Sequence, residues 1–586
     1  MPTLYVFIFG YSFFFVLGIL YYFSECYLKN SVNLDNLTNF NVNTTASNVL
    51  SKLISLNFYV IYLIILIILS FSLYTKPLSY YLLISLATII IMVQIFYNNT
   101  SLKTQGYVIL FLQIIPLAFI IRSSSFIINP YLIGPDVPWH FHQIQQIIEQ
   151  GSLEESAYHY YYYPSYHITQ AIGGVLLGYS KDIFYLINII QATVSILFAY
   201  LIGKEIFDNE KAGLICALLL SVSSANIFLA ILNTSKIGGA TLFALCFWLL
   251  LKINKSPTLK NAVLLWISAV PLFFWHPEVS FVLMVILGAN FVTQIFEVKI
   301  EHRSLFILYL VGYVAYLLYV HTSLFTSIVD SIFVEKQSTP GLISSYESRT
   351  INMEFLFQSF LAYLGITIPL FFVSYRGFKW INNLTKISLF ILSSFMLLHF
   401  IPVIGVLGGN FGLNPERTLI YVSMIAIFMS SGTLVEVFVL NNKASKILLI
   451  ILFFTFSFFS VSAYFTGDGN TFLKDEISIG TIFTTKSNLA SHQFLERTPE
   501  DSSLISDYET LRYTGDPVRG FFGLPNPIRD ISEFSAKMGD GYIVLNNPNL
   551  RRLCWEKSLW GVKVNQKIRT ENNIYNNGDI SIFSIT

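Results

Sequence analysis

The sequence predicts a mainly α protein: a polytopic transmembrane helical bundle of about 13 or 14 spans, followed by a small C-terminal α/β domain. Three observations predict this fold. Of 586 residues, 54% are hydrophobic and only 12% are charged, the charges fall between apolar runs, and the composition changes after Phe465. The charged fraction is roughly half that of a soluble globular chain. Water therefore cannot be the main solvent of this protein.

Each crossing of the hydrocarbon core needs roughly 17 to 25 mainly apolar residues. The first candidate run lacks a basic flank and a clear cleavage site, so we interpret it as a retained span. Several runs are short, which leaves one or two of them open as re-entrant segments. The candidate runs are residues 4–24, 57–75, 79–97, 106–121, 182–203, 209–225, 238–252, 261–275, 277–296, 304–320, 355–375, 386–402, 417–438 and 446–465.

Lys and Arg orient the bundle, because cytoplasmic loops retain positive charge. If Asp136 lies outside, five successive loops on the cytoplasmic side carry the basic residues, and the external loops keep fewer of them. We therefore expect a multi-pass protein of the cell membrane. The five loops contain Lys204 and Lys211, then Lys252, Lys255 and Lys260, then Lys299 and Arg303, then Arg376, Lys379 and Lys386, then Lys443 and Lys446.

The runs divide the chain into three parts. Residues 1–105 are N-terminal transmembrane helices, and residues 106–465 are a transmembrane core with external loops at 122–181 and 321–354. Residues 466–586 form a soluble extracytoplasmic domain. Within it we expect strands at Ser503–Ser506, Tyr542–Asn546 and Val562–Ile568, and a hairpin turn at Asn577–Gly578, where Asn-Gly supplies positive φ.

Net charge argues against nucleic-acid binding, and cysteine spacing argues against disulfides and a zinc site. The net charge is +1 without a cluster of Lys and Arg, so no nucleic-acid partner is expected. The four cysteines, Cys26, Cys216, Cys246 and Cys554, are widely scattered. This spacing indicates neither a disulfide framework nor a zinc site.

Residues 134–167 are the densest ionisable cluster between apolar runs. Apolar residues at helical spacing from Val137 to Ile148 predict an amphipathic helix in the membrane interface, which ends at Gly151. Asp136 precedes this helix. It is either an N-cap, which satisfies free backbone amides, or a general base that faces a lipid-linked substrate. The neighbouring His140 and His142 are candidate substrate ligands or plain interfacial side chains.

Gly134-Pro135-Asp136, the helix to Gly151, and Tyr163-Pro164 with His167 resemble the GT-C superfamily of integral membrane glycosyltransferases. The resemblance is to archaeal and bacterial members that use polyprenyl-phosphate sugars. In that class an Asp signature, an amphipathic helix ending in Gly and an aromatic stretch follow one another in the first large external loop. The stretch YLIGKEIFDNEKAGLICALLLSVSS is similar to the class too, with its span, short charged turn and returning span. The resemblance covers roughly residues 106–465.

The resemblance implies roles for three residues. Asp136 matches the catalytic carboxylate, which would accept the proton of the attacking acceptor. Arg417, at the outer start of a late span, matches an Arg that contacts the lipid phosphate; an Arg is always charged and can fork onto phosphate oxygens. Its alternative role is snorkelling to the interface. Residues 321–354 resemble the loop that covers the substrate, so Arg349 is a candidate substrate ligand. Its alternative is a solvated loop side chain.

One loop departs from the class. It carries Lys236 where many members carry a second acidic residue, so a two-carboxylate metal site is doubtful. Lys236 either faces a phosphate or is an ordinary loop lysine. His276 and Glu278, in Trp275-His276-Pro277-Glu278 at an outer tip, are candidate substrate ligands, since an interfacial Glu is costly unless used or paired. No cofactor is assigned, and a divalent cation, Mg or Mn, stays open.

The expected function is transfer of a sugar from a polyprenyl-phosphate donor, such as dolichyl phosphate, to an acceptor at the outer membrane face. The acceptor is a glycan, lipid or protein that the sequence does not identify. A transporter or flippase of lipid-linked glycans is one alternative, which predicts charges at midplane and broken helices. A noncatalytic cell-surface protein is another, although a single span would be enough for anchoring.

Overall fold

The structure, a computed structural model, describes most of the helical part of the chain and five short strands near its C-terminus. Helices dominate these residues, which confirms the mainly α bundle that the composition predicts. The described residues are 44–72, 76–97, 102–128, 137–152, 162–231, 234–296, 303–322, 326, 368–369, 372–382, 385–407, 415–439, 443–462, 503–506, 521–523, 541–546, 572–576 and 580–585.

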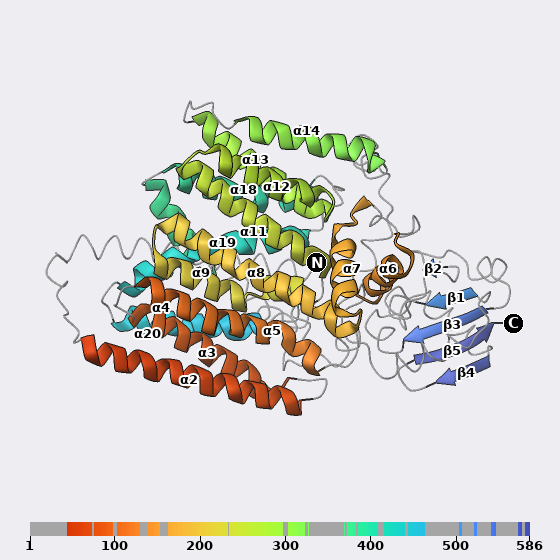
Figure 1. Cartoon of the computed structure of the whole chain (residues 1–586), viewed down its shortest axis with the longest axis horizontal. Helices are drawn as coiled ribbons and strands as arrows, with labels where there is room; N and C mark the ends of the chain where they lie inside the picture. Colours follow the sequence, from red (N-terminus) through yellow and green to blue (C-terminus); the bar gives the residue numbers. More distant parts are fainter. Residues whose placement is uncertain are drawn as a thin grey trace.

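The long helices run side by side in one bundle, with α6 and α7 at one end (Figure 1). A π-helical turn, η1, joins α4 to α5. The helices are α2 (Thr44–Phe71), α3 (Leu78–Tyr97), α4 (Leu102–Ile109), η1 (Leu110–Ile114), α5 (Ile115–Ile128), α6 (Val137–Gln150), α7 (Ser165–Leu177), α8 (Lys181–Phe207), α9 (Glu210–Val222), α10 (Ser224–Ile231), α11 (Thr234–Lys255), α12 (Leu259–Phe273), α13 (Pro277–Phe296), α14 (Arg303–Tyr319), α18 (Lys386–Leu407), α19 (Pro415–Val439) and α20 (Lys443–Val461).

Seven helices in the described chain are long and apolar enough to cross a membrane, and the bent pair α9 and α10 makes an eighth if it is one span. The chain is therefore a multi-pass membrane protein. Four shorter apolar helices coincide with further predicted runs. Predicted run 4–24 and most of 355–375 lie outside the described residues. The seven spans are Ile54–Phe71, Leu78–Tyr97, Gly106–Ile128, Lys181–Phe207, Ser235–Lys255, Pro277–Gln294 and Ile420–Phe438.

Basic residues predicted to be cytoplasmic meet at one end of the bundle. Lys252 of α11 lies 2.7 Å from the carboxylate of Glu205 in α8. Arg376 lies 2.7 Å from Glu436 of α19, and its guanidinium carbon lies 5.0 Å from the ring centroid of Phe207, where α8 ends. The ends of α8, α11 and α19 thus share one charged, partly exposed surface, as the predicted topology requires.

The opposite end of α11 carries Lys236, nineteen positions before Lys255. At about 1.5 Å per residue, the two lysines are roughly 30 Å apart along the helix axis. That distance equals the thickness of a bilayer hydrocarbon core, about 30 Å. The two ends of this one helix therefore fit the two faces of a membrane.

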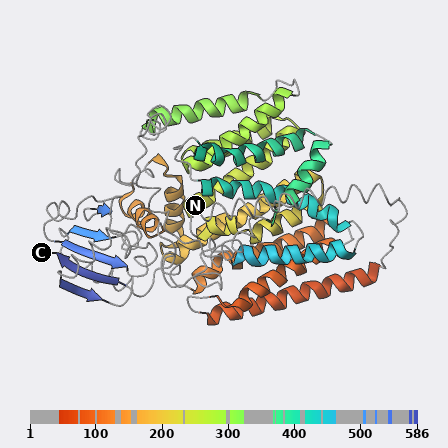
Figure 2. The same cartoon turned by 180° about the vertical axis from the view of Figure 1, so that it is seen from behind.

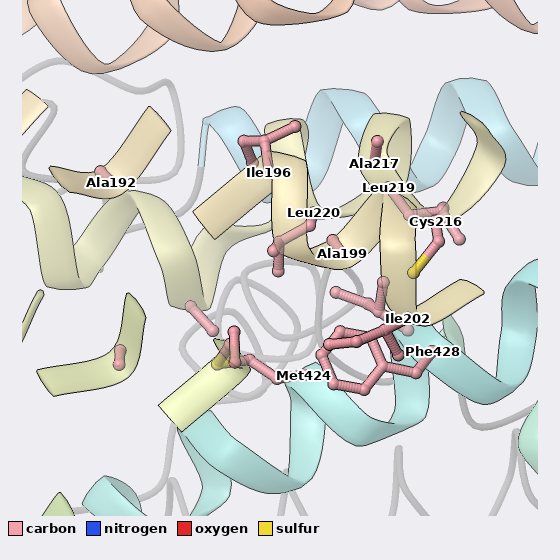
Figure 3. Packing of buried hydrophobic residues seen from close by; sticks show 14 of the residues in the cluster. Ala192, Ile196, Ala199, Ile202, Cys216, Ala217, Leu219, Leu220, Met424 and Phe428 are labelled. Carbon is pink, nitrogen blue, oxygen red and sulfur yellow. The ribbon is translucent and has the colours of Figure 1, made fainter. Parts of the chain in front are cut away.

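Helices α8, α9 and α19 form the centre of the core, with small and branched side chains in contact (Figure 3). A Cβ on Gly203 would lie 2.8 Å from the carbonyl oxygen of Ala212 and 2.6 Å from the Cβ of Cys216. A side chain at Gly203 would therefore force α8 and α9 apart. Lipid offers no hydrophobic gain for helix association, so close contact between small residues must supply the attraction.

A buried arginine holds the break between α9 and α10, which bend by 52°. Arg122 of α5 is fully buried. Its guanidinium donates to the carbonyl oxygens of Leu220 and Ser221, at 3.3 and 3.0 Å, on the α9 side of the break. It also donates to the side-chain oxygen of Asn226 in α10. Arg122 thus joins both halves of the bent pair to α5.

The five strands form one sheet in the order β2-β1-β3-β5-β4. Strand β1 is parallel to β2 and β3, and β5 is antiparallel to β3 and β4. The sheet lies beyond the end of the bundle that carries α6 and α7, in both views (Figures 1 and 2). The strands are β1 (Ser503–Ser506), β2 (Phe521–Gly523), β3 (Gly541–Asn546), β4 (Asn572–Asn576) and β5 (Ile580–Ile585).

Two of the predicted strands fall within β1 and β3. The predicted strand Val562–Ile568 and the turn Asn577–Gly578 lie outside the described residues, although the antiparallel β4 and β5 flank that turn. The segments between the strands are also outside the described residues. The α/β character of the C-terminal domain therefore stays a prediction.

Candidate functional site

Buried polar side chains meet where α7, α11 and α13 begin. The backbone amide of Ser165, the first residue of α7, donates to the carbonyl oxygen of Phe274 at 3.0 Å. The indole nitrogen of Trp275 donates to the carbonyl oxygen of Ser235, at the start of α11, at 3.0 Å. These bonds place the α12–α13 loop against the starts of α7 and α11. The site lies at the end of the bundle opposite the basic cluster.

Lys236 and Glu278 form a buried ion pair at this end. The Lys236 ammonium lies 2.5 Å from Oε2 of Glu278, and the two side chains are 2% and 6% exposed. Moving either charge out of water costs several kcal/mol, roughly, unless a partner compensates it. Each residue therefore provides the counter-charge that the other needs, and the pair joins the first turns of α11 and α13.

The local sequence explains why Glu278 takes this place. Pro277 is the first residue of α13, where its fixed φ suits a helix start and its missing amide costs nothing. Glu278 follows in the first turn, where a negative charge interacts favourably with the helix dipole. Its backbone amide donates to Nδ1 of His276 at 3.3 Å. His276 thus orders the helix start that carries the carboxylate.

A glycine makes room for the tryptophan of the same loop. A Cβ on Gly238 would lie 2.0 Å from Cζ2 of Trp275. The indole ring therefore packs directly on the backbone of α11, two positions after Lys236. Together with the hydrogen bond to Ser235, this contact fixes the loop that carries His276.

Tyr421 of α19 is a further buried polar side chain. Its hydroxyl has no hydrogen-bond partner among the residues that the structure describes. Its ring packs edge-on against Phe243 of α11 at a centroid distance of 5.4 Å. Arg417 lies four residues earlier in the chain, one turn nearer the start of α19.

Two buried histidines connect α6 to α7. Nδ1 of His140 lies 3.0 Å from Nε2 of His167, and both residues are at most 2% exposed. Burial lowers the pKa of His167 to about 3. The pKa of His140 is lowered well below its usual value. Burial is the larger cause, and charge repulsion from His167 is the smaller one. Both rings are therefore neutral near pH 7, so one donates its proton to the other.

Aromatic rings cover the histidine pair and the end of α14. Trp139 contacts His167 edge-on at 5.8 Å, and Tyr162 stacks on His321 at 4.4 Å. The hydroxyl of Tyr316 donates to the carbonyl oxygen of Tyr162. The tyrosine stretch therefore joins the α6–α7 region to the last turn of α14.

The structure brings together three of the eight predicted site residues: Lys236, His276 and Glu278. His140 is buried against His167, and His142 is partly exposed on α6. Arg417 lies in the first turn of α19, where the backbone alone is described. Asp136 and Arg349 lie outside the described residues; Asp136 directly precedes Val137, the first residue of α6. Their roles stay predictions.

Sequence reasoning missed Gly238 and Tyr421, and it gave His167 no role of its own. Tyr421 follows Arg417 by one helical turn, and this i, i+4 spacing is a signal that could have found it. The Gly238-Gly239 pair, just after Lys236, is a second signal, because paired glycines indicate close approach of another group. Nothing in the sequence pairs His140 with His167.

The described donor set does not fit a metal ion. Among the side chains that the structure describes, no three of His, Cys, Asp or Glu are grouped to hold a metal. Glu278, the carboxylate at the centre of the cluster, already binds an ammonium. The expected Mg or Mn ion stays a prediction.

The structure is similar to two enzymes of known structure. ArnT from Cupriavidus metallidurans in the apo state is 11% identical, with 82% of this chain and 98% of that chain covered and a TM-score of 0.49. The apo oligosaccharyltransferase from Archaeoglobus fulgidus is 14% identical, with 74% and 69% covered and a TM-score of 0.48. At sequence level, no family model and no curated protein gives a significant match.

Two further similar structures contain ligands. ArnT bound to undecaprenyl phosphate has a TM-score of 0.47 at 11% identity over 82% of this chain and 98% of that one. The Archaeoglobus fulgidus oligosaccharyltransferase AglB, in complex with an inhibitory peptide and a dolichol-phosphate, has a TM-score of 0.44 at 13% identity over 80% and 73%. These are likenesses of chain path.

Gly238→Ala should destabilise the protein by about 1–3 kcal/mol, the usual cost of an overpacked core, because the new methyl group displaces Trp275. Thermal unfolding of the purified protein in detergent measures the loss. Gly288→Ala on α13 is the matched control. Its Cβ would lie 3.5 Å from Phe306, so we expect no loss and a gain of up to about 1 kcal/mol from helix propensity. Equal melting of Gly238→Ala and wild type would contradict the packing.

Acid should weaken the α6–α7 junction. In the unfolded chain, His167 titrates near its ordinary pKa of about 6.5, whereas its folded pKa is about 3. Between these values the unfolded chain binds more protons, so stability rises with pH and is lost as the pH falls through this window. We expect His167→Gln to show a shallower fall of melting temperature between pH 7 and pH 4.

The control for this titration is Tyr179→Phe. The Tyr179 hydroxyl donates to the carbonyl oxygen of Phe141 at 2.7 Å, so its removal weakens the same junction without removing a histidine. Tyr179→Phe should melt lower than wild type at every pH but keep the wild-type slope. The interpretation fails if His167→Gln keeps that slope as well.

Proposed function

We propose that the protein is a membrane glycosyltransferase that moves a sugar from a polyprenyl-phosphate donor to an acceptor at the outer membrane face. The observation that carries this proposal is the buried Lys236–Glu278 pair, 2.5 Å apart, at the end of an apolar bundle opposite the basic cytoplasmic cluster. Ionisable residues in a membrane bundle are costly, and they often mark functional sites. An anionic headgroup is a ligand that a buried ammonium beside the hydrocarbon would attract.

The reaction is a single displacement with inversion at the anomeric carbon. Asp136 accepts the proton of the acceptor hydroxyl or amide as that group attacks the anomeric carbon. The bond from the anomeric carbon to the phosphate oxygen breaks, and its electron pair leaves with the polyprenyl phosphate. Negative charge therefore develops on that oxygen during the step, and a fixed cation nearby lowers the barrier.

Lys236 and Arg417 supply that cation in our proposal. Lys236 is already removed from water and held in place by Glu278, so it stabilises new charge without losing solvent at that moment. Arg417 lies in the first turn of α19, the helix end that the sequence assigns to the outer face. A guanidinium there would fork onto the phosphate oxygens. His142 and Arg349 remain candidate substrate ligands.

The C-terminal domain is part of the same proposal. Strands β1 to β5 lie beyond the end of the bundle that carries α6 and α7 (Figure 1). We therefore infer that residues 466–586 form an extracytoplasmic domain on the side of the site. A domain there is placed to contact the acceptor, whether glycan, lipid or protein.

The transporter alternative predicts broken helices and buried charges, and the described chain has both in α9–α10 and Arg122. However, all five N–H groups of Arg122 are used within the protein, with Ala118, Leu220, Ser221 and Asn226 as acceptors. No donor is left for a transported anion. The buried charge therefore closes the break, and the membrane glycosyltransferase remains the function that the site supports best.

Asp136→Asn should lower sugar transfer by about 10²- to 10⁴-fold, the usual contribution of a general base. The assay follows release of polyprenyl phosphate from labelled dolichyl-phosphate glucose or mannose in membranes that contain the native acceptors. Asp182→Asn is the matched control, because Asp182 is exposed at the start of α8 and its nearest cation, Lys181, is 3.8 Å away. Unchanged transfer by Asp136→Asn would refute the mechanism.

A further inference from the structure

Two cations share one carboxylate at the end of the bundle that the sequence assigns to the cytoplasm. Arg376 and Lys379 lie in the helical residues 372–382, and Glu436 lies in α19. Nη1 of Arg376 is 2.7 Å from Oε1 of Glu436, and the Lys379 ammonium is 2.7 Å from Oε2. One negative charge cannot balance two positive charges. The triad Arg376–Glu436–Lys379 therefore keeps an unbalanced positive charge.

The guanidinium of Arg376 is not saturated within the described chain. The side chain is only 3% exposed. Its Nε donates to the hydroxyl of Thr433 at 3.2 Å, and its Nη1 donates to Glu436. Its Nη2 is buried and has no hydrogen-bond partner in the part of the chain that the structure describes. A buried charged donor without an acceptor is strongly unfavourable, so an acceptor from outside the chain is expected.

The triad lies where apolar rings meet the aqueous surface. The guanidinium carbon of Arg376 is 5.0 Å from the ring centroid of Phe207 and 5.9 Å from a ring centroid of Trp380. The two rings stack on each other at 6.0 Å. Lys379 and Glu436 are 38% and 36% exposed, so the triad is open on their side. Tryptophan is typical of the headgroup level of a bilayer, and a lipid phosphate lies at that level.

A second triad adjoins the same end of α8. Glu205 of α8 binds Lys252 at 2.7 Å and Lys255 at 3.1 Å, both from α11. The Lys252 ammonium is also 6.0 Å from a ring centroid of Trp248. Glu205 precedes Phe207 by two residues, so both triads meet the last turn of α8. Together they hold four cations against two carboxylates.

The unbalanced charge and the unmet donor select the class of ligand. A phosphate oxygen accepts charge-assisted hydrogen bonds and brings the negative charge that the triads lack. Basic residues between helices on the cytoplasmic side of a membrane bind anionic headgroups in this way. A zwitterionic lipid brings a cation with its phosphate and therefore gains less. Free phosphate has the same oxygens but no acyl chains to hold it beside the apolar rings.

We propose that the Arg376–Glu436–Lys379 triad binds the phosphate of an anionic phospholipid in the cytoplasmic leaflet. The headgroup enters from the exposed side, where the flexible Lys379 side chain can move. A phosphate oxygen then accepts from Nη2 of Arg376. The Lys252–Glu205–Lys255 triad adds positive charge to the same surface. This site lies at the membrane face opposite the glycosyltransferase site, and it does not depend on the proposed function.

The test measures the melting temperature of the full-length protein in neutral detergent with added phosphatidylglycerol, phosphatidylcholine or inorganic phosphate. A ligand that binds the folded protein raises the melting temperature. Phosphatidylglycerol should raise it more than either of the others, and added salt should reduce the rise. An equal rise with phosphatidylcholine would overturn the proposal. An equal rise with inorganic phosphate would also overturn it, because the site would then bind free phosphate.

Lys379→Gln and Lys260→Gln are a matched pair, because each removes one positive charge from the same end of the bundle. Lys260 is exposed near the start of α12 and lies outside both triads. Lys379→Gln should lose most of the rise with phosphatidylglycerol, whereas Lys260→Gln should keep it. Equal rises in the two variants would overturn the proposal, because the protein would then respond to total charge alone.

Arg376→Lys separates the guanidinium from its charge. The variant keeps the positive charge but loses Nη2 and the forked geometry that suits phosphate. Its melting temperature without lipid falls if the buried side chain matters for folding, so the readout is the rise on adding phosphatidylglycerol. That rise should be smaller than in wild type. A full rise would overturn the assignment of the phosphate to Arg376.

Discussion

A buried ammonium and a buried carboxylate, 2.5 Å apart, join the starts of α11 and α13. Neither Lys236 nor Glu278 is tolerable there alone, since a lone charge in a low-dielectric surrounding is strongly destabilising. The pair therefore fixes where the two helices begin relative to each other. That position sets the path of the loop that carries Trp275 and His276. It also sets the electrostatics available to a substrate.

The rest of the bundle keeps this pair at one membrane face. Ion pairs such as Lys252–Glu205 hold the opposite ends of α8 and α11 together. Arg122 closes the break between α9 and α10 with hydrogen bonds to carbonyl groups and Asn226. Each of these charges thus has either an opposite charge or hydrogen-bond acceptors within the protein. The buried Lys236–Glu278 pair lies at the opposite end of α11, where that helix begins.

The sequence was sufficient for the spans that the structure describes and for the basic end, because hydropathy and the Lys and Arg bias are local properties. It also singled out Lys236, His276 and Glu278 as outer residues. It could not pair Lys236 with Glu278, 42 positions later, or His140 with His167, because those contacts depend on how the helices pack. The role of Asp136 and the α/β character of the C-terminal domain are predicted from sequence alone. Tyr421 escaped notice because a buried tyrosine in an apolar helix looks like ordinary core.

The most direct measurement is a double-mutant cycle on the ion pair, with Lys236→Met, Glu278→Gln and the double variant unfolded thermally in detergent and assayed for transfer. Each single variant should lose about 3–5 kcal/mol, the usual cost of a broken buried pair, and the double variant should recover most of it. The recovered protein should still transfer no sugar. Additive losses of stability, or normal transfer by the double variant, would contradict the account.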